Sequence, residues 1–186
     1  MKHKLILLYA WLVRTLLFFL PDIPVFMRFR GWLYGFPMKH KGCDFQVTHD
    51  AVIKDLWGLS VGNHVFVGNG TVIMGSGMVE IGDEVQFAPH CVIISGNHTL
   101  CDGSFRYGKG DAGLIQIRRG AWVAGNCTIQ RNSKLPEGSV LSANSFLNKV
   151  FEEPMSLYGG VPAKFIKKIV TMFAVGNTNK PIGDSP

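Results

Sequence analysis

The sequence predicts an all-β solenoid, in which short parallel strands stack into a triangular coil. An apolar residue returns at every sixth position, at Ile117, Val123, Ile129, Leu135, Leu141 and Leu147. That period matches neither the 3.6-residue period of a helix nor the two-residue period of a strand. Residues 53–63 also recur, with related side chains, as residues 73–83. Repeats of this kind are typical of stacked turns that bury their apolar sides against one another.

The residue four places after each apolar anchor is never large. These positions hold Val65, Thr71, Val85, Cys91, Ala121, Cys127, Ser133, Ser139 and Ser145. Small side chains suit the narrow interior of a prism whose turns lie about 4.8 Å apart. A glycine follows the anchor at Gly62, Gly68 and Gly82. We expect these glycines to hold a positive φ at tight corners.

The repeat is interrupted once. The chain takes eight residues from Ile73 to Ile81 but 24 from Ile93 to Ile117, which adds 16 residues at one corner. The added stretch is rich in glycine and polar residues, so we predict an exposed loop over about 95–113. Loops on a rigid scaffold often carry catalytic groups, and His98 lies at the root of this one. A histidine can remove the proton of an attacking hydroxyl, a contribution of about 10²- to 10⁴-fold.

Four segments carry a resemblance to a known family. They are the hexapeptide repeat, Gly96 to Thr99 (Gly-Asn-His-Thr), Ala121 to Gly125 (Ala-Trp-Val-Ala-Gly) and Gly159 to Lys164 (Gly-Gly-Val-Pro-Ala-Lys). Together they resemble the hexapeptide-repeat acyltransferases, which are left-handed parallel β-helices, over roughly residues 45 to 170. The likeness is greatest to the galactoside, maltose and polysaccharide O-acetyltransferases. It implies acetyl-CoA as co-substrate, a sugar or glycan acceptor, no metal, and a homotrimer with active sites between subunits.

The resemblance also implies roles for individual residues. His98 matches the general base, and Asn97 beside it would orient the loop or the acceptor. Trp122 would flank the pantetheine or acetyl group, and the backbone N–H of Gly125 would donate to the thioester oxygen. Asn69 stands near the position of a polar, acceptor-binding residue from the preceding turn. Coenzyme-lining positions are matched by Ala143, Asn148, Lys149, Lys164 and Lys167.

Other functions remain open at this point. The same scaffold and histidine would serve an N-acetyltransferase acting on an amino sugar or an antibiotic. A γ-type carbonic anhydrase needs three zinc-bound histidines, typically with His-x4-His spacing, whereas His90 and His98 are eight residues apart and His64 has no suitable partner. If the protein were a non-enzymatic β-helical scaffold, the insertion would have no evident function. The acid that orients His98 is also open, with Asp102 and Asp111 both near in sequence.

Residues 1–44 form a predicted apolar and basic helical segment. The stretch from Leu5 to Leu20 is almost wholly apolar, but as a helix it would span only about 24 Å of a hydrocarbon core of about 30 Å. We therefore expect no membrane crossing, and Arg14 argues against a signal peptide. Two alternatives remain: residues 1–35 lie on a membrane surface as a peripheral anchor, or they pack on the trimer or on the end of the β-helix.

The 186 residues suit one main domain. We place the β-helix at 45–158, a C-terminal cap at 159–175 and a loose tail at 176–186. The cap is expected to hold a short helix begun by Pro162, with Phe165, Ile169 and Phe173 on its apolar face. The formal net charge of +6 favours anionic partners, but no basic stripe with stacking aromatics indicates nucleic acid. Four cysteines without zinc-like or disulfide spacing fit the cytoplasm, including the inner face of the cytoplasmic membrane.

Overall fold

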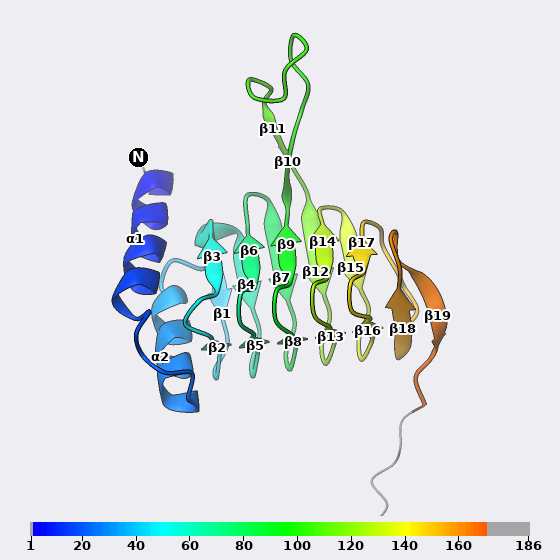
Figure 1. Cartoon of the computed structure of the whole chain (residues 1–186), viewed down its shortest axis with the longest axis horizontal. Helices are drawn as coiled ribbons and strands as arrows, with labels where there is room; N and C mark the ends of the chain where they lie inside the picture. The colour runs from blue at the N-terminus through cyan, green and yellow to red at the C-terminus, as the bar shows by residue number, and fades with distance from the viewer. Residues whose placement is uncertain (1, 171–186) are drawn as a thin grey trace, which may run out of the picture.

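The computed structural model, which describes residues 2–170, is a left-handed parallel β-helix with three faces (Figure 1). Face A consists of β1 (His40–Lys41), β4 (Leu59–Val61), β7 (Met78–Ile81), β12 (Leu114–Ile117) and β15 (Ser133–Leu135). Face B consists of β2 (Gln46–Val47), β5 (Phe66–Val67), β8 (Gln86–Phe87), β13 (Trp122–Val123), β16 (Val140–Leu141), β18 (Ser156–Gly159) and β19 (Lys164–Lys168). Face C consists of β3 (Val52–Lys54), β6 (Val72–Met74), β9 (Val92–Ile94), β14 (Thr128–Gln130) and β17 (Phe146–Leu147). A 3₁₀ turn, η1 (Leu56–Gly58), joins β3 to β4.

The predicted repeat sets the register of the stack. Ile53, Ile73 and Ile93 pair in line on face C, twenty residues apart. The six-residue series divides among the faces, so that Ile117 pairs with Leu135, Val123 with Leu141 and Ile129 with Leu147. All six of these side chains are buried. The prediction that consecutive anchors point into one shared core is therefore confirmed.

The small residues also lie where the repeat predicts, because all nine are buried inside the prism. The expectation of positive φ at Gly62, Gly68 and Gly82 is wrong. At these corners glycine is required by close approach: a Cβ on Gly62 would lie 2.4 Å from an oxygen of Asp83, and one on Gly82 would lie 2.7 Å from the backbone nitrogen of Arg119. The left-handed corner conformation falls two residues further on, at His64 and Glu84.

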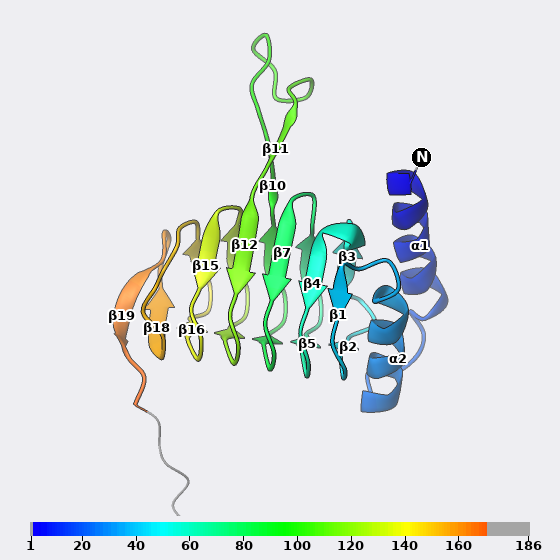
Figure 2. The same cartoon turned by 180° about the vertical axis from the view of Figure 1, so that it is seen from behind.

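The insertion forms an antiparallel hairpin. Strand β10 (Gly96–His98) pairs with β11 (Gly110–Ala112), and residues 96–112, called the arm below, stand out from the corner between faces C and A (Figures 1 and 2). Beyond the arm the stack resumes in register, with Leu114 opposite Met78. The arm is thus added to an unbroken prism.

Two helices cover the N-terminal end of the prism. Helix α1 (Lys2–Leu16) packs Ala10 and Val13 against the first turn, and α2 (Pro24–Tyr34) lies beside β2. The buried guanidinium of Arg30 donates to Asp22 at 2.8 Å and fixes the connection between the helices. In the described part of the chain, neither helix has the length and apolar composition needed to cross a bilayer.

The C-terminal end differs from the prediction. Residues 164–168, expected in a short helix, form β19, which pairs antiparallel with β18. Phe165, expected on an apolar helix face, instead lies against Tyr158 with ring centroids 6.0 Å apart. The free edge of β18 has unpaired backbone N–H and C=O groups, and β19 forms hydrogen bonds with them. These hydrogen bonds outweigh the weak helical pattern of the sequence. Phe173 and the expected tail at 176–186 lie outside the described residues.

Candidate active site

Buried hydrogen bonds hold the root of the arm. The fully buried Ser95 hydroxyl donates to the carbonyl of Met74 at 3.1 Å and accepts from the backbone N–H of Gly77 at 2.8 Å. The N–H of Gly113, where the chain returns, donates to the Ser95 carbonyl at 2.8 Å. Both ends of the arm are therefore tied to the preceding turn, which fixes the position of the residues just beyond them.

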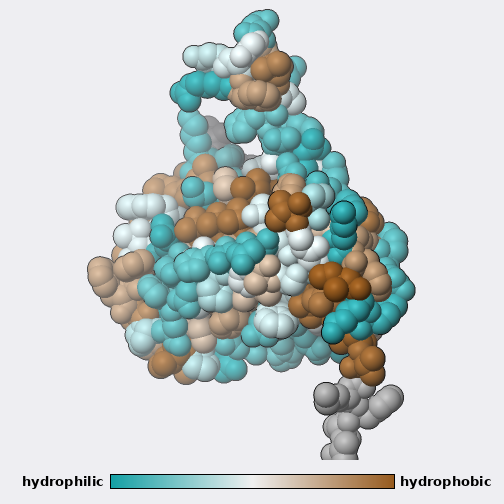
Figure 3. Space-filling model, turned by 45° about the vertical axis from the view of Figure 1, so that its right-hand side comes forward, coloured by the Kyte–Doolittle hydropathy of each residue, from teal (hydrophilic) through white to brown (hydrophobic). Residues whose placement is uncertain are grey.

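His98 and Asn97 lie in one cavity of about 660 Å³ between the arm and face C. Asp111 and Gly110 line it from the opposite strand of the arm. Its floor is formed by outward side chains of face C, namely Met74, Ile94, Thr128, Gln130 and Phe146. Figure 3 shows hydrophobic residues gathered on the body below the arm. The cavity thus combines an apolar floor with a few polar groups at its rim, as small-molecule sites usually do.

Among residues 2–170, no acidic side chain orients His98. Its side chain is exposed and makes no hydrogen bond to any residue between 2 and 170. Asp111 faces Asn97 across the hairpin and forms an ion pair with Arg131 at 2.9 Å, while the Asp102 carboxylate accepts a hydrogen bond from its neighbour Cys101. Neither aspartate named from the sequence plays the orienting role within one chain.

A second cavity adjoins the first. Met74 and Ser76 line both, and the second, of about 530 Å³, extends beneath α1, where Trp11 and Arg14 border it. Asp55 lies in its wall with only 9% of its side chain exposed. One carboxylate oxygen accepts from Ser76 at 3.1 Å, and the other lies 3.2 Å from His3 Nε2.

Sequence reasoning missed Asp55. The signal was present in the internal repeat, since Asp55 stands where the next unit has Gly75. Its φ of 53° places it in the left-handed region. A polar substitution at a corner of the repeat could therefore have been noticed as an exception to the pattern. The partner His3 could not, because it comes from a helix outside the repeat.

The predicted thioester-binding residues lie at another corner. Trp122 is on face B with 47% of its surface exposed, and Gly125 and Ala143 occupy successive turns of the corner between faces B and C. The backbone N–H groups of Gly125 and Ala143 have no hydrogen-bond partner among the described residues, so both can donate to a ligand. None of the three lines the His98 cavity.

The remaining predicted residues are spread over the surface. Asn148 and Lys149 follow β17 at the same corner as the arm, two turns further on, and the Lys149 ammonium lies over Phe151 at 5.1 Å. Lys164 and Lys167 are exposed on β19.

Asn69 is used structurally: its amide donates to Asp22 at 3.1 Å and to Asp50 at 3.2 Å. It does not line the His98 cavity, so one chain does not place it beside the predicted base.

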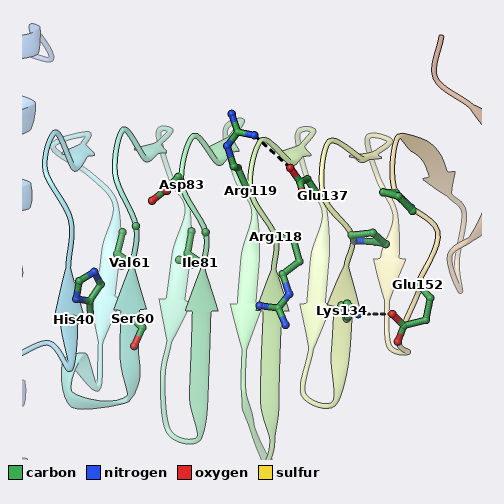
Figure 4. A pocket seen from close by; sticks show the side chains of 14 residues that line it. His40, Ser60, Val61, Ile81, Asp83, Arg118, Arg119, Lys134, Glu137 and Glu152 are labelled. Carbon is green, nitrogen blue, oxygen red and sulfur yellow. Dashed lines mark hydrogen bonds and ion pairs between the residues drawn. The ribbon is translucent and has the colours of Figure 1, made fainter. Parts of the chain in front are cut away.

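A further cavity of about 590 Å³ lies along face A and its corner with face B (Figure 4). Its cations are largely matched by anions, since Arg119 pairs with Glu137 at 3.3 Å and Lys134 pairs with Glu152. None of the predicted site residues lines it. Across residues 2–170, no three His, Cys, Asp or Glu side chains are grouped so as to hold a metal ion.

The fold has counterparts in known proteins. The chain is 31% identical over 132 residues to a Staphylococcus aureus (strain COL) protein named "Putative acetyltransferase", a match that covers 67% of this chain and 66% of that protein, just under two thirds of its length. A maltose O-acetyltransferase from Clostridium difficile 630 superposes with a TM-score of 0.79 at 21% identity, covering 91% of this chain and 89% of the other.

A hexapeptide-repeat acetyltransferase from Vibrio cholerae O1 biovar eltor, solved with acetyl coenzyme A, superposes with a TM-score of 0.76 at 21% identity, covering 91% of this chain and 90% of the other. An N-acyltransferase from Bacillus cereus matches less closely, with a TM-score of 0.58 at 14% identity over 68% of this chain and 81% of the other. No family model matches the sequence. The chain therefore has the fold of the hexapeptide-repeat acetyltransferases, and in sequence it is similar to a protein named as a putative acetyltransferase.

Proposed function

We propose that this protein is an acetyl-CoA-dependent O-acetyltransferase that transfers an acetyl group to a hydroxyl of a sugar or of a surface-glycan precursor. The observation that carries the proposal is His98 at the rim of an apolar-floored cavity, on an arm whose two ends are fixed to the prism. The names of the similar proteins support acetyl transfer. The maltose O-acetyltransferase among them supports a sugar hydroxyl as acceptor.

The proposed reaction is a direct transfer. The acceptor oxygen attacks the thioester carbon while His98 removes the hydroxyl proton. The tetrahedral intermediate then collapses, the C–S bond breaks, and His98 returns the proton to the departing thiolate. The exposed imidazole can approach a hydroxyl bound in the cavity without first breaking a bond to a neighbour.

The two joined cavities offer a path for the acceptor. Sugars present apolar faces and many hydroxyls, and the Asp55 carboxylate and the Arg14 guanidinium supply an acceptor and donors below α1. One oxygen of the buried Asp55 carboxylate lies 3.2 Å from the His3 imidazole, whereas Arg14 Nε belongs to the buried polar groups that have no hydrogen-bond partner among residues 2–170. Such groups are costly unless they bind something, which supports a polar acceptor in this cavity. The acceptor would reach from α1 to His98.

The donor side of the site requires a second copy of the chain. His98 and the free amides of Gly125 and Ala143 lie at different corners of one prism and share no cavity. A closed homotrimer, in which the arm of one subunit faces the corner between faces B and C of its neighbour, would bring them together. In that arrangement the amide of Gly125 would stabilise the oxyanion, a contribution of about 10²- to 10³-fold.

The proposed compartment is the cytoplasm. All four cysteines are free, and Cys43 and Cys101 are exposed. Exposed free thiols suit a reducing environment.

Mass spectrometry of candidate glycans incubated with the protein and acetyl-CoA tests the function. We expect a gain of one acetyl group that mild alkali removes, because an ester is labile where an amide is not. An acetyl group that survives the treatment would instead establish an N-acetyltransferase. No acetyl gain on any hydroxyl or amine acceptor, with acetyl-CoA left intact, would contradict both reactions.

A further inference from the structure

The outer faces of the two N-terminal helices are apolar. On α1, Leu5, Leu8, Leu12 and Leu16 follow one another at intervals of three and four residues, and all are exposed. This spacing places them in a single stripe along the helix. The opposite side of α1 carries Ala10 and Val13, which pack on the prism, so the leucine stripe points away from it.

Helix α2 and the turn before it extend this surface. Val25, Phe29, Trp32 and Phe36 have the same spacing and are exposed, while Met27, Arg30 and Gly31 face inward. Trp32 packs against Phe29 and Phe36 with ring centroids 6.0 and 4.6 Å apart, which holds the aromatic group in place. Phe19, in the turn, is 91% exposed. Of the 23 large hydrophobic residues that are exposed in the described part of the chain, twelve thus fall within residues 5–36.

The charge of the molecule is concentrated in the same segment. Residues 1–43 contain seven of the 19 Lys and Arg residues and one of the 13 Asp and Glu residues, so they carry the whole formal net charge of +6. The one acid, Asp22, is taken by Arg30 and His49. Arg28 and Lys41 line a groove of about 570 Å³ beside Trp32, although Arg28 also pairs with Asp44. Cations therefore border the apolar surface.

We propose that this end of the prism docks on an anionic lipid surface, with the leucine stripe of α1 and the aromatic group of α2 inserted at the level of the headgroups. Apolar insertion combined with cations beside anionic lipid is the usual basis of interfacial binding. A protein partner would account for the exposed apolar surface, but not for the excess of positive charge in the same 43 residues.

The docking would set the orientation of the enzyme. Both helices lie across the end of the stack (Figure 1), so the prism axis would stand up from the membrane. His98 follows the third strand of face C, which places it roughly 25 Å above the lipid, allowing about 10 Å for a helix and about 4.8 Å for each turn. An acceptor carried on a lipid would have to extend its sugars that far.

Vesicle co-sedimentation of the full chain tests the docking, independently of any acetyl transfer. The anionic vesicles consist of phosphatidylethanolamine with about 30% phosphatidylglycerol. Vesicles of phosphatidylcholine alone serve as the uncharged comparison. The variant Leu8→Gln/Leu12→Gln should bind anionic vesicles at least about tenfold more weakly than wild type. The control Leu100→Gln/Phe105→Gln, which removes two apolar residues of the arm that are more exposed than Leu8 and Leu12, should bind as wild type does. High salt should weaken wild-type binding.

Sedimentation velocity of the same proteins excludes the alternative. An unchanged oligomeric state in the α1 variant, together with lost vesicle binding, supports the lipid surface. A variant that dissociates would show that the stripe is an interface between copies and would overturn the proposal. Failure of the wild type to bind anionic vesicles, or equal binding by the α1 variant, would also overturn it.

Discussion

Ile81 and Ile117 pair in register on neighbouring strands of face A although 36 positions separate them, whereas Val61 and Ile81 in the preceding pair are 20 apart. The 16 additional residues leave the stack as the arm and do not disturb the register on either side. The scaffold and the proposed catalytic element are therefore structurally separable.

Deleting residues 97–112 tests this separation. The deletion joins Ser95-Gly96 to Gly113-Leu114, which reproduces the corner Gly75-Ser76-Gly77-Met78 of the preceding turn. We expect a folded β-helix with nearly unchanged melting temperature and circular dichroism, but no acetyl transfer. A deletion variant that unfolds would show that the arm stabilises the prism.

The four thiols should react in two classes. Burial raises the pKa of the Cys91 thiol to about 11 and also raises that of Cys127, so both stay protonated near pH 8. Cys43 and Cys101 are exposed. Because the thiolate is the reactive form, a chromogenic disulfide reagent should titrate two thiols rapidly in the native protein and four after denaturation. Four rapid thiols in the native protein would be inconsistent with the closed interior.

Alanine at Gly82 should destabilise the protein. Its Cβ would lie 2.7 Å from the backbone nitrogen of Arg119 in the next turn, where nothing flexible can yield. We expect a loss of about 1–3 kcal/mol in the free energy of unfolding, measured by denaturant titration. Gly110→Ala is the matched control, because a Cβ there meets no atom within 4 Å. Equal stability of the two variants would refute the close-approach explanation of the corner glycines.

Mixed oligomers test whether the active site is shared. His98→Ala removes the base, and Gly125→Tyr should block the donor corner without disturbing the fold, since its Cβ would meet only one atom, at 3.5 Å. Each variant alone should be inactive. Refolded together at equal amounts, they should recover about a quarter of wild-type activity, because random assembly leaves that share of interfaces with both groups intact. Recovery at the background level would place the site within one subunit.

The prism could be predicted from the repeat because the position of each apolar anchor marks one strand of one turn. The spacing of Ile73 from Ile93, and of Ile117 from Leu135, already contains the register that the strands adopt. His98 was found by the same reasoning, since the interruption of a regular period is visible in sequence. Local pattern and global fold agree over this region, as they do in sequences that specify one structure.

What the sequence missed depends on contacts between distant segments. The amide of Asn69 is occupied by Asp22, 47 residues earlier, and β19 forms because β18 leaves an edge to pair with. The predicted reason for glycine at the corners is wrong, because a side chain there is excluded by atoms of the next turn and not by the φ of the glycine itself. None of these contacts recurs at a fixed spacing along the chain, so a single sequence does not reveal them.

The kinetics of His98→Asn test the central claim most directly. With acetyl-CoA and an acceptor identified by mass spectrometry, we predict that kcat falls by about 10²- to 10⁴-fold. Acetyl-CoA affinity, measured by calorimetry, should stay close to that of the wild type, because the proposed donor contacts come from Trp122 and from the backbone amides of Gly125 and Ala143, not from the imidazole. Turnover at the wild-type rate in a variant that still binds acetyl-CoA would contradict the assignment of His98 as the catalytic base.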